Sequence, residues 1–67
     1  MSVAKVIEVA ASSPKSFQDA IDSGVERAAK TVNNLQGGWI KEMKVDIENG
    51  KVTAYRVNMK LTFVLED

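Results

Sequence analysis

The residues that could carry out chemistry in this sequence are few, because its 67 residues include no His and no Cys. Without them there is no imidazole base, no thiolate nucleophile and no Cys/His zinc site. Ser12, Ser13 and Ser16 stand where a helix start needs capping side chains. No phosphate-binding loop or metalloenzyme motif is present. We therefore expect a binding protein and not an enzyme.

Oxygen ligands for a hard cation occur beside one predicted turn, where Asp46 and Glu48 precede Asn49. Calcium takes about six to eight oxygen ligands, and one chain supplies too few at this spacing. Symmetry could bring several copies to one ion. The alternative interpretation is that both carboxylates are solvated surface charges. Asp46 and Glu48 are thus the candidate metal ligands.

Two further side chains could bind a small molecule. Trp39 is the only tryptophan, and it could either stack on a planar ligand or fill a contact between subunits. Arg56 is expected to face Glu42 across a β-ribbon, where the two would form an ion pair of little energetic value if exposed. Alternatively, the Arg56 guanidinium could bind an anionic ligand or a neighbouring subunit.

These candidates lie in a segment, Gly37 to Asp67, that has the pattern of a two-stranded ribbon folded at Glu48-Asn49-Gly50. Asn-Gly between two alternating runs strongly indicates a β-hairpin. A two-residue loop would mix apolar and polar residues on each face, whereas a three-residue loop separates them and pairs Trp39 with Met59. We therefore predict a three-residue loop with Gly50 at a positive φ.

The residues before the ribbon predict a strand and a helix. Val3 to Ala11 is rich in β-branched residues, as in a strand. The helix has Ser13 or Ser16 as its cap and runs to about Asn34 on an apolar three- and four-residue spacing. Gly24 lies within the apolar stripe, where it costs about 1 kcal/mol relative to Ala. It either permits a close approach of helix to sheet or is merely tolerated.

The order of elements is therefore β-α-β-β in a single domain, residues 1–67, of the α+β class. We predict a three-stranded antiparallel sheet with the third strand in the centre, packed on one helix. The alternative topology has the second strand in the centre.

The size of the chain and its strand length predict self-association. Folded chains of this length bury only about 60% of their unfolded surface. The strand at 51–66 would span about 50 Å, whereas a helix of about 20 residues spans about 30 Å. We expect other copies to cover the apolar residues beyond the helix, unless the strand bends or frays after Lys60. These residues are Met59, Leu61, Phe63 and Leu65.

Charge and hydropathy argue against two classes of partner. Nine basic and nine acidic residues balance to zero, so nothing indicates a nucleic-acid partner. No apolar run is long enough for a membrane span or a signal peptide. We expect a cytoplasmic protein.

Several short motifs occur in an order that resembles one known family. They are Lys5-Val6-Ile7-Glu8 before Ser12-Ser13-Pro14, Asp19-Ala20-Ile21, Arg27-Ala28-Ala29-Lys30-Thr31, Asn49-Gly50, and Ala54-Tyr55 leading into Lys60-Leu61-Thr62-Phe63. Together they resemble the dodecins, small β-α-β-β proteins. The resemblance implies a homododecameric hollow shell with a binding, non-catalytic role. The usual ligands of the family are flavins such as riboflavin and FMN.

The positions that the resemblance assigns to flavin binding are altered in this chain. Where flavin-binding members carry a stacking Trp, this chain has Gly37, and Trp39 follows two residues later on the same strand face, about 6.5–7 Å away. Where they carry a Gln, this chain has Arg56, which can only donate hydrogen bonds. The chain therefore looks more like the flavin-independent branch, for which calcium binding has been proposed. Flavin binding through the displaced Trp39 is the alternative.

Overall fold

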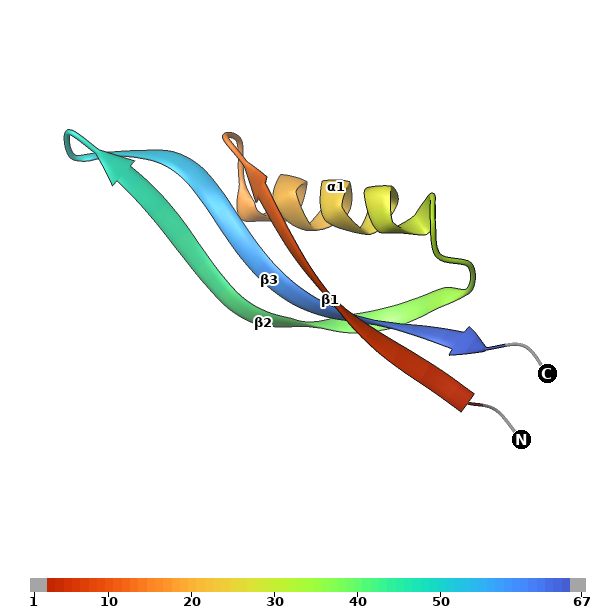
Figure 1. Ribbon diagram of the computed structural model, residues 1–67. Coiled ribbons are helices and arrows are strands. Elements are labelled where there is room, and N and C mark those ends of the chain that lie inside the picture. Colours follow the sequence, from red (N-terminus) through yellow and green to blue (C-terminus); the bar gives the residue numbers. More distant parts are fainter. Residues whose placement is uncertain (1–2, 66–67) are drawn as a thin grey trace.

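The computed structural model describes residues 3–65, which form one helix and one three-stranded sheet (Figure 1). The elements are β1 (Val3–Ser13), α1 (Phe17–Ala29), β2 (Leu35–Glu48) and β3 (Lys51–Leu65). The strand order is β1-β3-β2, and both neighbouring pairs are antiparallel. The predicted β-α-β-β topology with the third strand in the centre is confirmed.

The hairpin loop has two residues, so the predicted three-residue loop is wrong. Glu48 pairs with Lys51, and both loop residues have positive φ, 52° at Asn49 and 75° at Gly50. Two positive φ values match a type I′ turn, whose twist suits the flanking strands. The faces are not mixed, because the register shifts by one residue between Asp46 and Ile47. A β-bulge thus does what the longer loop was expected to do.

The helix begins at Ser16, which decides between the two predicted caps. The Ser16 Oγ accepts a hydrogen bond from the Asp19 backbone N–H at 3.0 Å. The buried Ser13 instead supports the same turn, because its Oγ donates to Oδ2 of Asp19 at 2.6 Å. The helix ends at Ala29, earlier than the predicted end near Asn34, which has a φ of 63°. The left-handed backbone at Asn34 leads the chain into β2.

Gly24 lies at a close contact between α1 and the sheet. A Cβ atom at this position would lie 2.7 Å from Cε of Met59 and 2.9 Å from Cβ of Ala11. Because carbon atoms in contact are normally about 3.5–4.0 Å apart, Gly24 provides the close approach of helix to sheet that was one of its two predicted roles.

The longer uncovered part of the sheet is at the end opposite to the one that the sequence predicted, although Leu65 at the predicted end is also 43% exposed, as is its partner Val3 at 50%. Met59 and Leu61 were expected to lie beyond the helix, but they are only 1% and 5% exposed and form the core with Ala20 and Val57. The reason is that α1 starts beside Tyr55, whose ring lies 5.1 Å from that of Phe17, and runs back over the sheet. Glu66, the predicted end of the last strand, lies outside the described residues.

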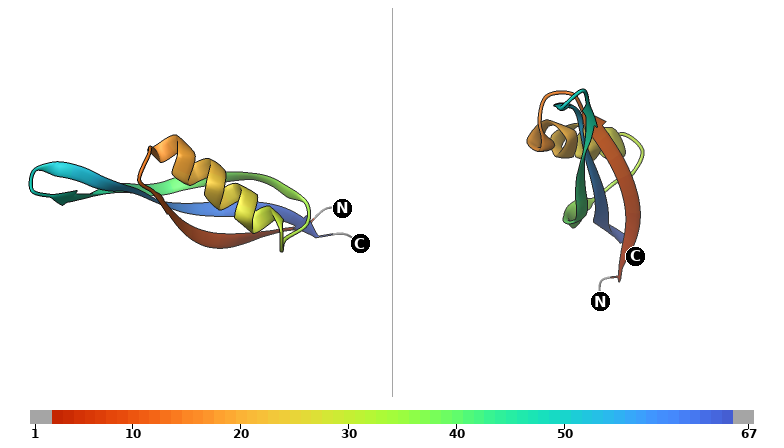
Figure 2. Two further views of the ribbon diagram at one scale, coloured as in Figure 1. Left: turned by 90° about the horizontal axis from the view of Figure 1, so that it is seen from above. Right: turned by 90° about the vertical axis from the view of Figure 1, so that its left-hand side faces the viewer.

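The turn at Asn49-Gly50 and the strand residues next to it therefore extend beyond both α1 and β1 (Figures 1 and 2). A 13-residue helix is about 20 Å long, whereas residues 3–65 extend over 52 Å. The predicted mismatch in length between sheet and helix is thus present, but most of it lies at the end of the sheet that carries the Asn49-Gly50 turn.

Candidate functional site

The candidate ligand-binding residues lie on the face of the sheet that points away from α1, which we call the outer face. Val57 of β3 is buried under the helix, so the preceding Arg56 lies on the outer face. Cross-strand partners share a face, and Gly37, Trp39 and Asp46 pair with outer-face residues of β3. Glu48 lies at the end of β2 opposite Lys51.

Arg56 does not face Glu42, as the sequence predicted, but Lys44. The cause is the two-residue loop together with the bulge next to it, because each shifts the register by one residue from the predicted pairing. Arg56 instead donates from Nε to Oδ2 of Asp46 at 2.8 Å, with side-chain exposures of 52% and 34%. An ion pair this exposed contributes at most about 1 kcal/mol to stability. The arrangement joins one candidate ligand-binding residue to one candidate metal ligand.

Other polar pairs continue along the outer face. Asn58 donates from Nδ2 to Oε1 of its partner Glu42 at 3.0 Å. Lys41, the extra residue of a second register shift in β2, lies 3.1 Å from Oε2 of Glu8 on β1. This exposed pair links the two edge strands across β3. The outer face between these pairs is therefore a polar surface, with Trp39 as its large aromatic side chain.

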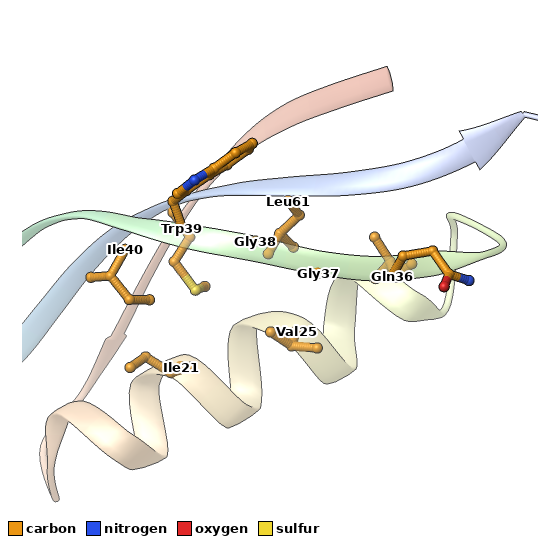
Figure 3. A pocket seen from close by; sticks show the side chains of 10 residues that line it. Ile21, Val25, Gln36, Gly37, Gly38, Trp39, Ile40 and Leu61 are labelled. Atoms are coloured by element: carbon orange, nitrogen blue, oxygen red, sulfur yellow. The ribbon is translucent and has the colours of Figure 1, made fainter. Parts of the chain in front are cut away.

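Trp39 pairs with Lys60, and the predicted pairing with Met59 is wrong because Ile40 takes that place. The indole is 59% exposed and points away from α1 (Figure 3). It therefore does not contribute to the core of the single chain, and its large exposed surface is available to a ligand or to another subunit.

The adjacent Gly37 and Gly38 differ in their surroundings. A Cβ atom at Gly37 would have no heavy atom within 4 Å, so the outer face is open there. A Cβ atom at Gly38 would lie 2.7 Å from the backbone oxygen of Lys60 and 2.8 Å from Cδ2 of Leu61. Glycine is thus needed for packing at position 38, whereas position 37 has room for a side chain.

The carboxylates of one chain do not make a complete metal site. Within residues 3–65 there is no group of three or more His, Cys, Asp or Glu side chains placed to hold a metal ion. Asp46 is already bonded to Arg56 through Oδ2. Calcium binding at Asp46 and Glu48 therefore stays a prediction that requires ligands from more than one copy.

An apolar groove between α1 and β2 was not expected from the sequence. Its volume is about 320 Å³. Its walls include Ile21, Val25, Leu35, Gly38, Ile40 and Leu61 (Figure 3). The groove exists because α1 packs mainly on β1 and β3 and leaves the helix-side face of β2 uncovered. Ile21 and Val25 belong to the apolar stripe of the helix, but periodicity alone does not show which strand the helix leaves uncovered.

In the described part of the chain, no helix has the length and hydropathy needed to span a membrane.

Comparison with known proteins finds relatives that match nearly the whole chain. A model of the Dodecin family matches residues 3–66. The chain is similar to the calcium dodecin of Mycobacterium tuberculosis, with 33% identity over 64 residues, which are 94% of this chain and 89% of that protein.

Solved structures give the same result. Dodecin from Streptomyces coelicolor has 32% sequence identity and a TM-score of 0.92, with 98% of this chain and 94% of that chain covered. The calcium dodecin from Mycobacterium tuberculosis, described as having a novel calcium-binding site, has 28% identity and a TM-score of 0.82 over 96% and 91% of the two chains. These similarities extend over all four elements.

Proposed function

Because this chain belongs to the dodecin family, whose members form homo-oligomers, we propose that it is a non-catalytic binding protein of the calcium type. In this proposal the protein assembles into a homododecameric shell and binds calcium between copies instead of storing flavin.

The observation that carries the proposal is the environment of Gly37. The family resemblance assigns the flavin-stacking Trp to this position, and here the outer face is open with no side chain. The only indole, that of Trp39, is two residues along the strand and pairs with Lys60. Two residues correspond to about 6.5–7 Å, so the indole is displaced by about a full ring-to-ring spacing from the position assigned to the stacking Trp.

Arg56 supports the same conclusion. It stands where the resemblance assigns a flavin-bonding Gln, and its guanidinium has no acceptor to offer to a flavin edge. Its Nε is also already engaged by Asp46. A flavin edge at this position would find only donors, one of which Asp46 already occupies.

Calcium is supported by the carboxylates near the turn and by the relative that is named calcium dodecin. Asp46 and Glu48 lie two residues apart on one strand, at the end of the sheet that the helix leaves uncovered. Several copies that meet at a symmetry axis would bring enough oxygen atoms together for one ion.

The proposal is tested on protein purified without added flavin. We expect a colourless assembly by visible absorption, no quenching of riboflavin fluorescence on titration, and a thermal midpoint that rises with CaCl2. Calcium at a free concentration of about 100 times its Kd would stabilise the folded state by about 2.7 kcal/mol. An equal concentration of MgCl2 is the control for ionic strength. A yellow protein whose thermal midpoint does not change with added CaCl2 would contradict the proposal.

Flavin binding is the second candidate, and one observation favours it. Trp39 is 59% exposed, and the space beside it over Gly37 is free, so a planar ring could lie against the indole there. The variant Trp39→Ala separates the roles of this residue. Loss of riboflavin binding by an intact assembly supports a carrier, whereas dissociation of the assembly supports a role in subunit packing.

A further inference from the structure

Large apolar side chains are left exposed along one flank of the helix-side face. Val25 and Ile40, on the two walls of the α1–β2 groove, are 37% and 43% exposed. Ile47 and Val52 face each other across the hairpin, next to the turn, and are 62% and 45% exposed. We call Ile47 and Val52 the hairpin tip.

The hairpin tip cannot reach the groove of its own chain. Ile47 lies seven residues beyond Ile40 along β2, a distance of about 23 Å on an extended strand. The tip and the groove thus lie at opposite ends of one apolar stripe on the helix-side face of β2, which continues between them through Met43, itself 52% exposed. One end of the stripe protrudes and the other is hollow.

The edge of β2 is poorly suited to the addition of a strand from a neighbouring molecule. The register between β2 and β3 shifts at three places, and at two of them the extra residue, Gln36 or Lys41, lies in β2 itself. Such bulges twist an edge strand and interrupt the row of backbone groups that a new strand would need. The flank is therefore suited to contact through side chains.

We propose that the hairpin tip of one copy packs into the α1–β2 groove of a second copy. The inference rests on the self-assembly in the proposed function and names the contact that builds it. A second copy is the occupant because family members form homo-oligomers and each chain carries both a hairpin tip and an α1–β2 groove. Repetition of such a head-to-tail contact closes into rings and, with further contacts, into a shell.

Cross-linking tests this contact directly, since the chain has no native Cys. A double variant, Val25→Cys with Ile47→Cys, is treated with a short homobifunctional maleimide and run on a denaturing gel. We expect a ladder of dimers, trimers and larger species, because each copy offers both partners. The single variant Ile47→Cys should remain monomeric on the gel.

The matched control pairs Ile47→Cys with Val6→Cys, since Val6 is 47% exposed on the outer face, away from the groove. No ladder is expected from it. A ladder from the control, dimers from Ile47→Cys alone, or no ladder from the test variant would each overturn the tip-in-groove contact. Sedimentation of the same variants separates the two proposals. An intact assembly without the ladder overturns only the contact, whereas a monomer overturns self-assembly as well.

Discussion

Arg56 holds Asp46 on the outer face through a bond of 2.8 Å from Nε to Oδ2. The two residues are not direct cross-strand partners, because Arg56 lies opposite Lys44 and reaches along β2 to the next outer-face position. A candidate calcium ligand is thus paired with a cation in the single chain. Any calcium ion at Asp46 must compete with Arg56 for that carboxylate.

Replacing Arg56 with Gln is therefore expected to strengthen stabilisation by calcium. The exposed ion pair is worth at most about 1 kcal/mol, so the gain in calcium affinity should not exceed about fivefold. It is measured as a shift to lower CaCl2 concentration of the rise in thermal midpoint. The matched control is Lys44→Gln, which removes one positive charge from the same face without freeing Asp46. Equal effects of both variants would mean that the Arg56–Asp46 pair does not compete with calcium and that only the net charge of the face matters.

Replacing Gly24 with Ala is expected to destabilise the protein although Ala is the better helix former. The added Cβ would lie 2.9 Å from Cβ of Ala11, a short side chain that cannot move aside. Overpacking costs about 1–3 kcal/mol, which outweighs the gain in helix propensity of about 1 kcal/mol. The measurement is urea unfolding at a fixed protomer concentration.

The control for Gly24→Ala is Ser23→Ala on the exposed side of the same helix turn. This change should leave stability the same or raise it slightly, because only propensity is altered. A Gly24→Ala protein as stable as Ser23→Ala would show that helix and sheet can separate at no cost.

The order of the strands and the position of the turn could be predicted because they depend on local patterns. Asn49-Gly50 favours a hairpin wherever it lies between alternating runs, and the topology follows from the order of elements. The register could not be predicted, because bulges shift it and the sequence around Lys41 does not identify this residue as the extra residue of a bulge. A bulge depends on the partner strand and on the curvature of the whole sheet.

The same cause limits the prediction of the site. The cross-strand partner of each candidate residue depends on the register. The two-residue loop and the bulge beside it together put Lys44, and not Glu42, opposite Arg56. Gly37 and Gly38 are identical in the sequence, but the Lys60 backbone crowds only the second. The groove between α1 and β2 depends on which strands the helix covers, and this is a tertiary property.

Replacing Gly50 with Ala is expected to weaken the hairpin. Its φ of 75° is in the left-handed region, where a residue with a Cβ costs about 1–2 kcal/mol. The neighbouring Lys51→Ala, which lies at the first position of β3, is the control and should have little effect. Urea unfolding compares the two variants with the parent. Equal stabilities would argue against the two-residue turn.

Introducing an indole at the open position over the outer face is expected to create flavin binding. In Gly37→Trp the new side chain meets no heavy atom at its Cβ, so the fold should tolerate it. Combined with Arg56→Gln, it supplies both the aromatic platform and the amide that the family resemblance assigns to flavin binders. Riboflavin fluorescence should then be quenched on titration, whereas the parent protein should leave it unchanged.

The control for this double variant is Gly37→Leu with Arg56→Gln. Leucine fills similar space on the same strand face but offers no flat π-surface, so it retains the packing change and removes the stacking. Quenching by the Trp variant alone would mean that the parent lacks flavin binding because Gly37 provides no aromatic platform. Quenching by the Leu variant, or by the parent, would show that Trp39 already stacks flavin from its place opposite Lys60, and the calcium-type proposal would then give way to the carrier.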